Sequence, residues 1–119
     1  ILMRNGISLI RLASITSTHE RLRNITEDAD GFIYAVTVKG VTGARKDIPE
    51  ETRSYLRALK EISPIPVFAG FGIATPEHVR IMGECCDGVV VGSKIIECFR
   101  QGDEAAIAEL IQTARKTSV

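Results

Sequence analysis

Two glycine-containing segments of the sequence carry groups that could hold an anion. Gly70 to Ala74 reads Gly-Phe-Gly-Ile-Ala, and Gly92-Ser93 ends the apolar run that begins at Gly88. Glycine lacks a Cβ, so backbone N–H groups can approach a ligand closely there, and the N–H groups at the start of a helix attract negative charge. These segments predict a phosphate site in which the Ser93 hydroxyl is a further donor. The alternative is that the glycines only permit tight turns and that Ser93 only caps a helix.

A third segment, Gly40-Val41-Thr42-Gly43, lies in a long polar loop that runs from Lys39 to Pro49. Long loops with glycine hinges at strand ends often act as lids, and Thr42 could offer its hydroxyl to a substrate. A flexible surface loop is the alternative interpretation. Tyr34 precedes this loop and is expected to face inward, where it either lines a pocket or belongs to the core.

Groups for proton transfer are missing from the positions where catalysis would need them. A general acid or base requires a carboxylate or a histidine at a strand end, and none of the four expected strand ends carries one. His19 and His78 lie near expected helix starts, where side chains usually face solvent or cap the helix. Asp47 and Glu50 are expected to cap the helix that follows them. The residues therefore predict binding rather than catalysis.

The three cysteines, Cys85, Cys86 and Cys98, predict neither disulfides nor a metal site. Their number is odd, and neighbours such as the first two rarely bridge, so a secreted disulfide framework is not expected. A zinc site at the adjacent pair would lack its other ligands. We expect reduced, buried thiols.

The elements that must position these residues alternate between strand and helix. Strands are expected at residues 7–13, 31–37, 67–70 and 88–91. The expected helices are one ending near Asp28, one with Tyr55, Leu56, Leu59 and Ile62 on one face, one capped by Thr75 and Pro76 that ends near Gly83, a short apolar one at 94–99, and one from Asp103 to Arg115-Lys116. Apolar strands separated by helices belong in a parallel sheet covered by helices. Periodicity alone leaves two α/β folds open, a doubly wound sheet and half of an eightfold barrel.

Charge and composition narrow the class of partner. The 119 residues contain fifteen Lys and Arg and fifteen Asp and Glu, which gives a formal net charge of zero. This removes the electrostatic footprint expected of a nucleic-acid binder or a membrane-surface protein. No apolar run approaches the ~20 residues of a membrane span, so a cytoplasmic location is expected. The opening residues, Ile1 to Gly6, resemble the last turn of a helix, which suggests a piece of a longer chain.

Four motifs in this order and spacing resemble the carboxyl-terminal half of the tryptophan synthase alpha subunit. They are Gly31-Phe-Ile-Tyr34, Gly40-Val-Thr-Gly43, Gly70-Phe-Gly-Ile73 and Gly88-Val-Val-Val-Gly-Ser93. The resemblance covers essentially the whole chain. The first strand's end, Ala13 to Thr16, differs from the more proline-rich turn of many family members.

The resemblance implies a (βα)₈ TIM barrel in which residues 1–119 are the carboxyl-terminal half of a single domain, the fifth to eighth βα units. It implies a lyase that cleaves indole-3-glycerol phosphate to indole and glyceraldehyde 3-phosphate by a retro-aldol route. It also implies a beta subunit as partner, with pyridoxal phosphate in that subunit and no cofactor or metal in this one. The family's catalytic glutamate and aspartate lie in the amino-terminal half, so no residue of this chain inherits their role.

The motifs carry over three groups of site residues. The resemblance assigns the substrate phosphate to Gly72, Gly92 and Ser93, the substrate pocket to Tyr34 and Phe71, and the lid loop to Thr42 and Gly43.

Two other functions remain open. One is a non-catalytic phosphate-binding half-barrel that associates with itself, because four parallel strands leave two open edges and an uncovered apolar face. The other is a different phosphate-binding barrel enzyme, which would share the anion site but not the pocket.

Overall fold

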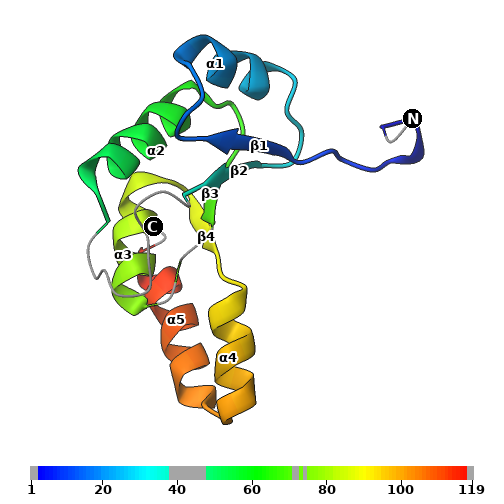
Figure 1. Ribbon diagram of the computed structural model, residues 1–119. Coiled ribbons are helices and arrows are strands. Elements are labelled where there is room, and N and C mark those ends of the chain that lie inside the picture. Colours follow the sequence, from blue (N-terminus) through cyan, green and yellow to red (C-terminus); the bar gives the residue numbers. More distant parts are fainter. Residues whose placement is uncertain (1–2, 38–47, 71–72, 74, 118–119) are drawn as a thin grey trace.

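A computed structural model of the chain describes residues 3–37, 48–70, 73 and 75–117 (Figure 1). Four of the predicted site residues, Thr42, Gly43, Phe71 and Gly72, lie outside these described residues. The described elements are a 3₁₀ helix η1 (Met3–Asn5), β1 (Arg11–Ser14), α1 (His19–Glu27), β2 (Ile33–Val36), α2 (Glu50–Ile62), β3 (Val67–Gly70), α3 (Pro76–Cys85), β4 (Gly88–Val90), α4 (Ser93–Gln101) and α5 (Glu104–Thr117).

The strands form one parallel sheet in the order β1-β2-β3-β4. Strands that follow one another in the chain are therefore neighbours in space, joined by helical crossovers as parallel pairing requires. This confirms the predicted parallel sheet. A doubly wound sheet would reverse its strand order at some point. The monotonic order instead matches part of a barrel wall.

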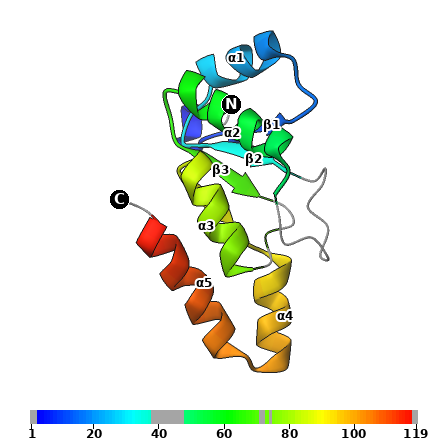
Figure 2. The same ribbon diagram turned by 90° about the vertical axis from the view of Figure 1, so that its left-hand side faces the viewer.

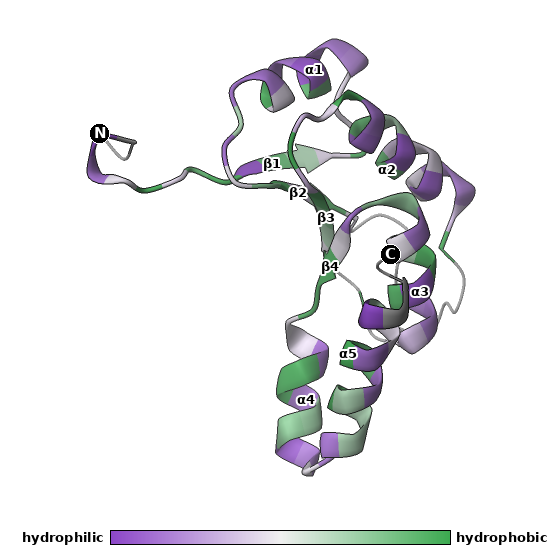
Figure 3. Cartoon of the chain, turned by 180° about the vertical axis from the view of Figure 1, so that it is seen from behind, coloured by the Kyte–Doolittle hydropathy of each residue, from purple (hydrophilic) through white to green (hydrophobic). Residues whose placement is uncertain are grey.

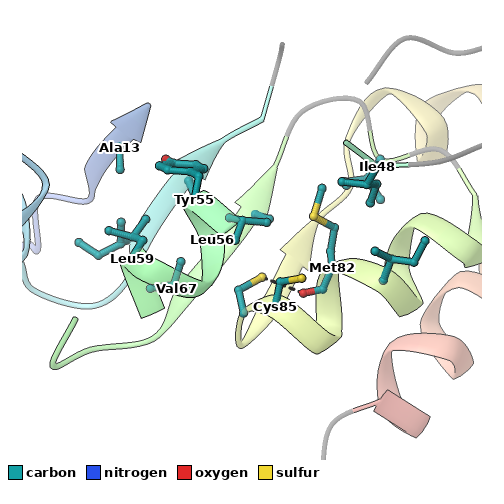
Figure 4. Close-up of a cluster of buried hydrophobic side chains, with 14 of the residues drawn as sticks. Ala13, Ile48, Tyr55, Leu56, Leu59, Val67, Met82 and Cys85 are labelled. Atoms are coloured by element: carbon teal, nitrogen blue, oxygen red, sulfur yellow. Dashed lines mark hydrogen bonds between the residues drawn. The ribbon is translucent and has the colours of Figure 1, made fainter. Parts of the chain in front are cut away.

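One face of the sheet is covered by α1, α2 and α3 (Figure 1). Side chains alternate between the two faces of a strand, so every second residue points toward these helices. The in-register alanines Ala13, Ala35 and Ala69 do so and are buried, as are Ile33 and Val67. Small residues at this level let the helices pack close to the sheet, where Figure 4 shows the side chains of α2 and α3 gathered in the core.

The opposite face of the sheet has no described helix over it (Figures 1 and 3). Leu12, Tyr34 and Phe68 lie side by side on this open face through the strand register, and the Phe68 ring is 4.8 Å from that of Phe32. Leu12 is 64% exposed. In a complete barrel this face would be the filled interior.

Local signals account for three helix starts. The Thr18 and Thr75 hydroxyls accept hydrogen bonds from the N–H groups of Arg21 and His78, and the Asp103 carboxylate accepts one from Ala106. Such caps satisfy donors that a helix leaves open at its first turn. The predicted capping of α2 by Glu50 is wrong, since Pro49 is the N-cap and makes no side-chain bond. The Glu50 carboxylate instead lies near Ser54 and Arg57, and Asp47 is outside the described residues.

Several element boundaries differ from the predictions. β2 spans Ile33–Val36 rather than residues 31–37, and β4 ends at Val90 rather than at residue 91. β1 begins at Arg11 rather than residue 7, because its partner β2 begins opposite it at Ile33 and leaves residues 7–10 beyond the ladder. α3 continues past Gly83 to Cys85, and the short apolar helix expected at 94–99 extends over all of α4.

α4 and α5 form a helical hairpin, and α5 packs back against α3 (Figure 2). Gly102 makes the turn with φ +68°, a left-handed conformation that glycine adopts without a steric penalty. α3 is therefore enclosed by α2, β4 and α5.

Buried polar and sulfur-containing side chains follow from this packing. His78 of α3 is 1% exposed, so the prediction that it faces solvent or caps the helix is wrong, whereas His19 is exposed as predicted. Cys85, Cys86 and Cys98 are buried, as predicted, and none of them forms a disulfide in the structure. None of the described helices is both long and apolar enough to cross a membrane.

Candidate functional site

The carboxyl ends of the four strands lie at one edge of the sheet. The register aligns Ser14, Val36, Gly70 and Val90 across the four strands. Parallel α/β sheets bind their ligands at this edge, because the loops and helix starts after each strand converge there. Gly92-Ser93 follows β4 at the same edge.

The start of α4 presents unpaired donors at this edge. Gly92 is the N-cap, and its carbonyl accepts hydrogen bonds from Ile95 and Ile96 at 3.0 and 3.2 Å. The N–H groups of Ser93 and Lys94 belong to the first turn and have no intrahelical acceptor. Within the described part of the chain, the Ser93 hydroxyl makes no hydrogen bond. The helix dipole adds partial positive charge at this point.

The start of α4 is exposed. Gly92 and Ser93 are both exposed, and a Cβ placed on Gly92 would meet nothing within 4 Å. Ser93 is the first helical residue rather than the cap, so the interpretation that it serves only as a cap loses its basis. Lys94 is the nearest cation along the chain, and its ammonium lies 3.9 Å from the Glu97 carboxylate. An anion here would meet mainly backbone donors.

Tyr34 reaches from β2 over the carboxyl end of β3. Its ring lies above Gly70: a Cβ on Gly70 would fall 2.5 Å from Tyr34 Cζ and closer still to the hydroxyl oxygen. Only glycine leaves room for the ring in this position. Tyr34 is half-buried on the open face, as its predicted inward orientation requires. Its hydroxyl therefore lies at the edge from which the chain continues into Phe71.

Thr37, which follows β2, holds the Gly70 peptide through hydrogen bonds. It is buried, and both its N–H and its hydroxyl donate to the Gly70 carbonyl, at 3.0 and 2.6 Å. Sequence reasoning singled out neither Thr37 nor the role of Gly70. The signal that could have found them is a hydroxyl residue at one strand end and a glycine at the end of the next.

The family model for the tryptophan synthase alpha chain matches residues 1–118. The chain belongs to this family. A tryptophan synthase alpha chain from Bacillus cereus is 49% identical over 116 residues, which cover 98% of this chain and 45% of the relative. One from Oceanobacillus iheyensis is 50% identical over 111 residues, covering 93% and 42%. The chain thus spans less than half the length of the curated relatives it matches.

Solved structures of tryptophan synthase resemble this chain and identify its fold. A chain of Mycobacterium tuberculosis tryptophan synthase superposes with a TM-score of 0.80 at 31% identity, covering 95% of this chain and 44% of that one. The alpha subunit from Campylobacter jejuni gives 0.68 at 31% identity, covering 94% and 44%. The four-stranded sheet with its helices is therefore part of a TIM barrel.

In this member of the tryptophan synthase alpha chain family, the residues that end the four described strands carry no acid or base. These residues are Ser14, Val36, Gly70 and Val90, and none has a carboxylate or an imidazole. Among the described residues, no three His, Cys, Asp or Glu side chains come together as a metal site.

Cys86 and Tyr55 have raised pKa values. Burial raises the pKa of the Cys86 thiol to about 11, and that thiol donates to the carbonyls of Met82 and Gly88. Burial also raises the pKa of Tyr55, whose hydroxyl has no partner within the described part of the chain. Both residues belong to the helix-covered core (Figure 4). Shifted pKa values often mark active sites, but here burial in the core explains them.

Proposed function

We propose that residues 1–119 are the carboxyl-terminal half of a single barrel domain, its fifth to eighth βα units, and that this half holds the phosphate of indole-3-glycerol phosphate. The parent reaction is a retro-aldol cleavage to indole and glyceraldehyde 3-phosphate. The observation that carries the proposal is the exposed start of α4, with Gly92 and Ser93 at the carboxyl edge of a sheet of this family.

The phosphate is bound by donors rather than by a basic patch. The N–H groups of Ser93 and Lys94 and the Ser93 hydroxyl point their protons at the anion, and the dipole of α4 favours negative charge there. Gly72, which follows β3 in the sequence, contributes a further backbone N–H in this proposal. A net charge of zero is compatible with such a site, because its positive potential comes from the backbone.

The indole part of the substrate lies beside Tyr34 and Phe71, whose rings offer flat apolar surface to an aromatic ligand. Thr42 and Gly43 belong to the loop that closes over the site. The beta chain is the partner, and pyridoxal phosphate belongs to that chain alone, while this one takes no cofactor. The protein works in the cytoplasm.

Proton transfer falls to carboxylates outside these 119 residues. Breaking the carbon–carbon bond requires an acid that protonates the indole ring and a base that takes the hydroxyl proton of the glycerol chain, and the described carboxyl edge has neither. We therefore infer that the isolated chain binds the substrate without cleaving it.

Thermal melts test the binding proposal. Indole-3-glycerol phosphate should raise the unfolding midpoint more than inorganic phosphate at equal concentration, because it adds the contacts of the indole pocket to those of the phosphate site. Equal shifts would favour a barrel enzyme with another substrate. The absence of any shift with either ligand would contradict the phosphate site itself.

Self-association is a second candidate, and exposed apolar side chains favour it. Leu12 on the open face, and Ile96 and Phe99 of α4, are each more than half exposed. A second copy would cover such surfaces, because apolar patches left in water promote association. Light scattering should then give twice the monomer mass. A stable monomer at high concentration would rule this candidate out.

A further inference from the structure

The Gly70 carbonyl is held by two donors from one residue. In a parallel ladder a carbonyl normally accepts one backbone N–H, and here Thr37 supplies it at 3.0 Å. The Thr37 hydroxyl adds a second bond at 2.6 Å that uses the remaining lone pair of the oxygen. Thr37 is 1% exposed, so water does not compete for this bond.

Gly70 is also where the ring of Tyr34 rests. Its Cα has no room for a side chain because the Tyr34 ring occupies the space, and its carbonyl is bonded from β2. Tyr34 of β2 and Thr37, the residue after β2, therefore both contact Gly70 of β3. A shift of the Gly70 peptide would move the surface on which Tyr34 lies.

We propose that Thr37 is a positioning residue for the ligand site. Its hydroxyl fixes the Gly70 peptide against β2 and so keeps Tyr34 and the end of β3 in the arrangement that receives the substrate. Thr37 itself touches no ligand. The inference rests on the proposed function, because it assigns Thr37 to the same site.

Removing the hydroxyl leaves the Gly70 carbonyl with a hydrogen bond. In Thr37→Val the side chain keeps its branched shape, and the Gly70 carbonyl keeps its bond to the backbone N–H. The fold should therefore survive, while the orientation of the peptide loses one of its two restraints. Thr37→Ser retains the hydroxyl and is the matched control.

Amide hydrogen exchange tests, without any ligand, whether the Thr37 hydroxyl holds the Gly70 peptide in place. The N–H of residue 37 should exchange about fivefold faster in Thr37→Val, since one hydrogen bond of ordinary strength is lost, and return to the wild-type rate in Thr37→Ser. The Ile33 N–H, which bonds the Pro66 carbonyl at the other end of the strand, should not change. Unchanged exchange at residue 37, or equal acceleration at Ile33, would overturn the proposal.

Calorimetry with indole-3-glycerol phosphate then tests the link to the site. Thr37→Val should bind about fivefold more weakly and Thr37→Ser within about twofold of wild type. Wild-type affinity in Thr37→Val would refute the positioning role even if exchange responds. If the wild-type chain does not bind this ligand, the proposed function fails, and the positioning role of Thr37 fails with it. The exchange result shows separately whether the Thr37 hydroxyl holds the Gly70 peptide.

Discussion

Ser93 is the side chain on which the proposed ligand site depends most directly. Its place at a helix start could be predicted, because Gly-Ser after an apolar run marks a strand that leads into a helix. The contact of Tyr34 with Gly70 could not, since it depends on the register between β2 and β3. The Thr37 hydroxyl bond was equally hidden, because it joins residues 33 positions apart.

Ser93→Asp should abolish binding of indole-3-glycerol phosphate while leaving the fold intact. The carboxylate would repel the phosphate and remove a donor, but a negative charge in the first turn of α4 stabilises the helix by about 0.3–1 kcal/mol. Calorimetry measures the affinity and circular dichroism the fold. Ser93→Ala, which loses only one hydrogen bond, should weaken binding about fivefold. Tight binding by Ser93→Asp would refute the assigned site.

Gly70→Ala should lower the free energy of unfolding by about 1–3 kcal/mol, because the new methyl group overlaps the ring of Tyr34. Shortening the tyrosine in Gly70→Ala/Tyr34→Leu should recover part of that loss. Gly92→Ala is the control, since its Cβ would meet nothing within 4 Å. Urea denaturation of wild type, Gly70→Ala, Tyr34→Leu and the double variant gives the coupling free energy between the two residues. Additive effects of the Gly70 and Tyr34 changes would mean that the two residues do not touch.

The buried Cys86 thiol should make stability fall at alkaline pH. Its pKa is raised to about 11 in the fold, so between pH ~9 and ~11 the unfolded chain loses this proton while the folded chain keeps it. The folded state's advantage is complete below this window and is lost as pH rises through it. The difference in unfolding free energy between wild type and Cys86→Ala should shrink by about 2 kcal/mol from pH 8 to pH 11. A constant difference would contradict this.

At the scale of elements, local signals predict helix starts and long-range packing decides burial. Thr75-Pro76 predicts the start of α3, and Val67 to Gly70 predicts β3 with the observed bounds. The burial of His78 was missed because it depends on the elements that pack against α3, and one of them, α5, comes much later in the chain. The first residue of β1 was mispredicted because β1 can pair only where β2 lies beside it, and β2 begins at Ile33, opposite Arg11.

The hairpin of α4 and α5 depends on the turn at Gly102. Gly102→Ala should cost about 1 kcal/mol of stability, because a side chain at φ +68° is strained even though the site has open space. Gly102→Asn should cost less, since asparagine tolerates the left-handed region better. Thermal unfolding followed by circular dichroism compares them. Equal stability of all three chains would show that the turn conformation does not matter.

At the scale of the whole molecule, the described residues form a sheet with one face covered by α1, α2 and α3 (Figure 1). The radius of gyration of the chain is 14.9 Å, above the about 13.5 Å typical of a compact domain of this length. The α4–α5 hairpin and the amino-terminal segment project from the body (Figure 1). Exposed apolar residues on the open face and on α4 fit a sheet that is one part of a barrel wall. Composition alone, typical of a complete small domain, could not have predicted this.

An NMR titration of the ¹⁵N-labelled chain with indole-3-glycerol phosphate tests the central claim most directly. We expect the amide signals of Ser93 and Lys94 to shift most among the described residues, because they donate to the phosphate. The Asp87 amide, which bonds Val67 at the opposite edge of the sheet, should stay in place. Binding that leaves Ser93 and Lys94 unshifted, or no binding at all, would contradict the account.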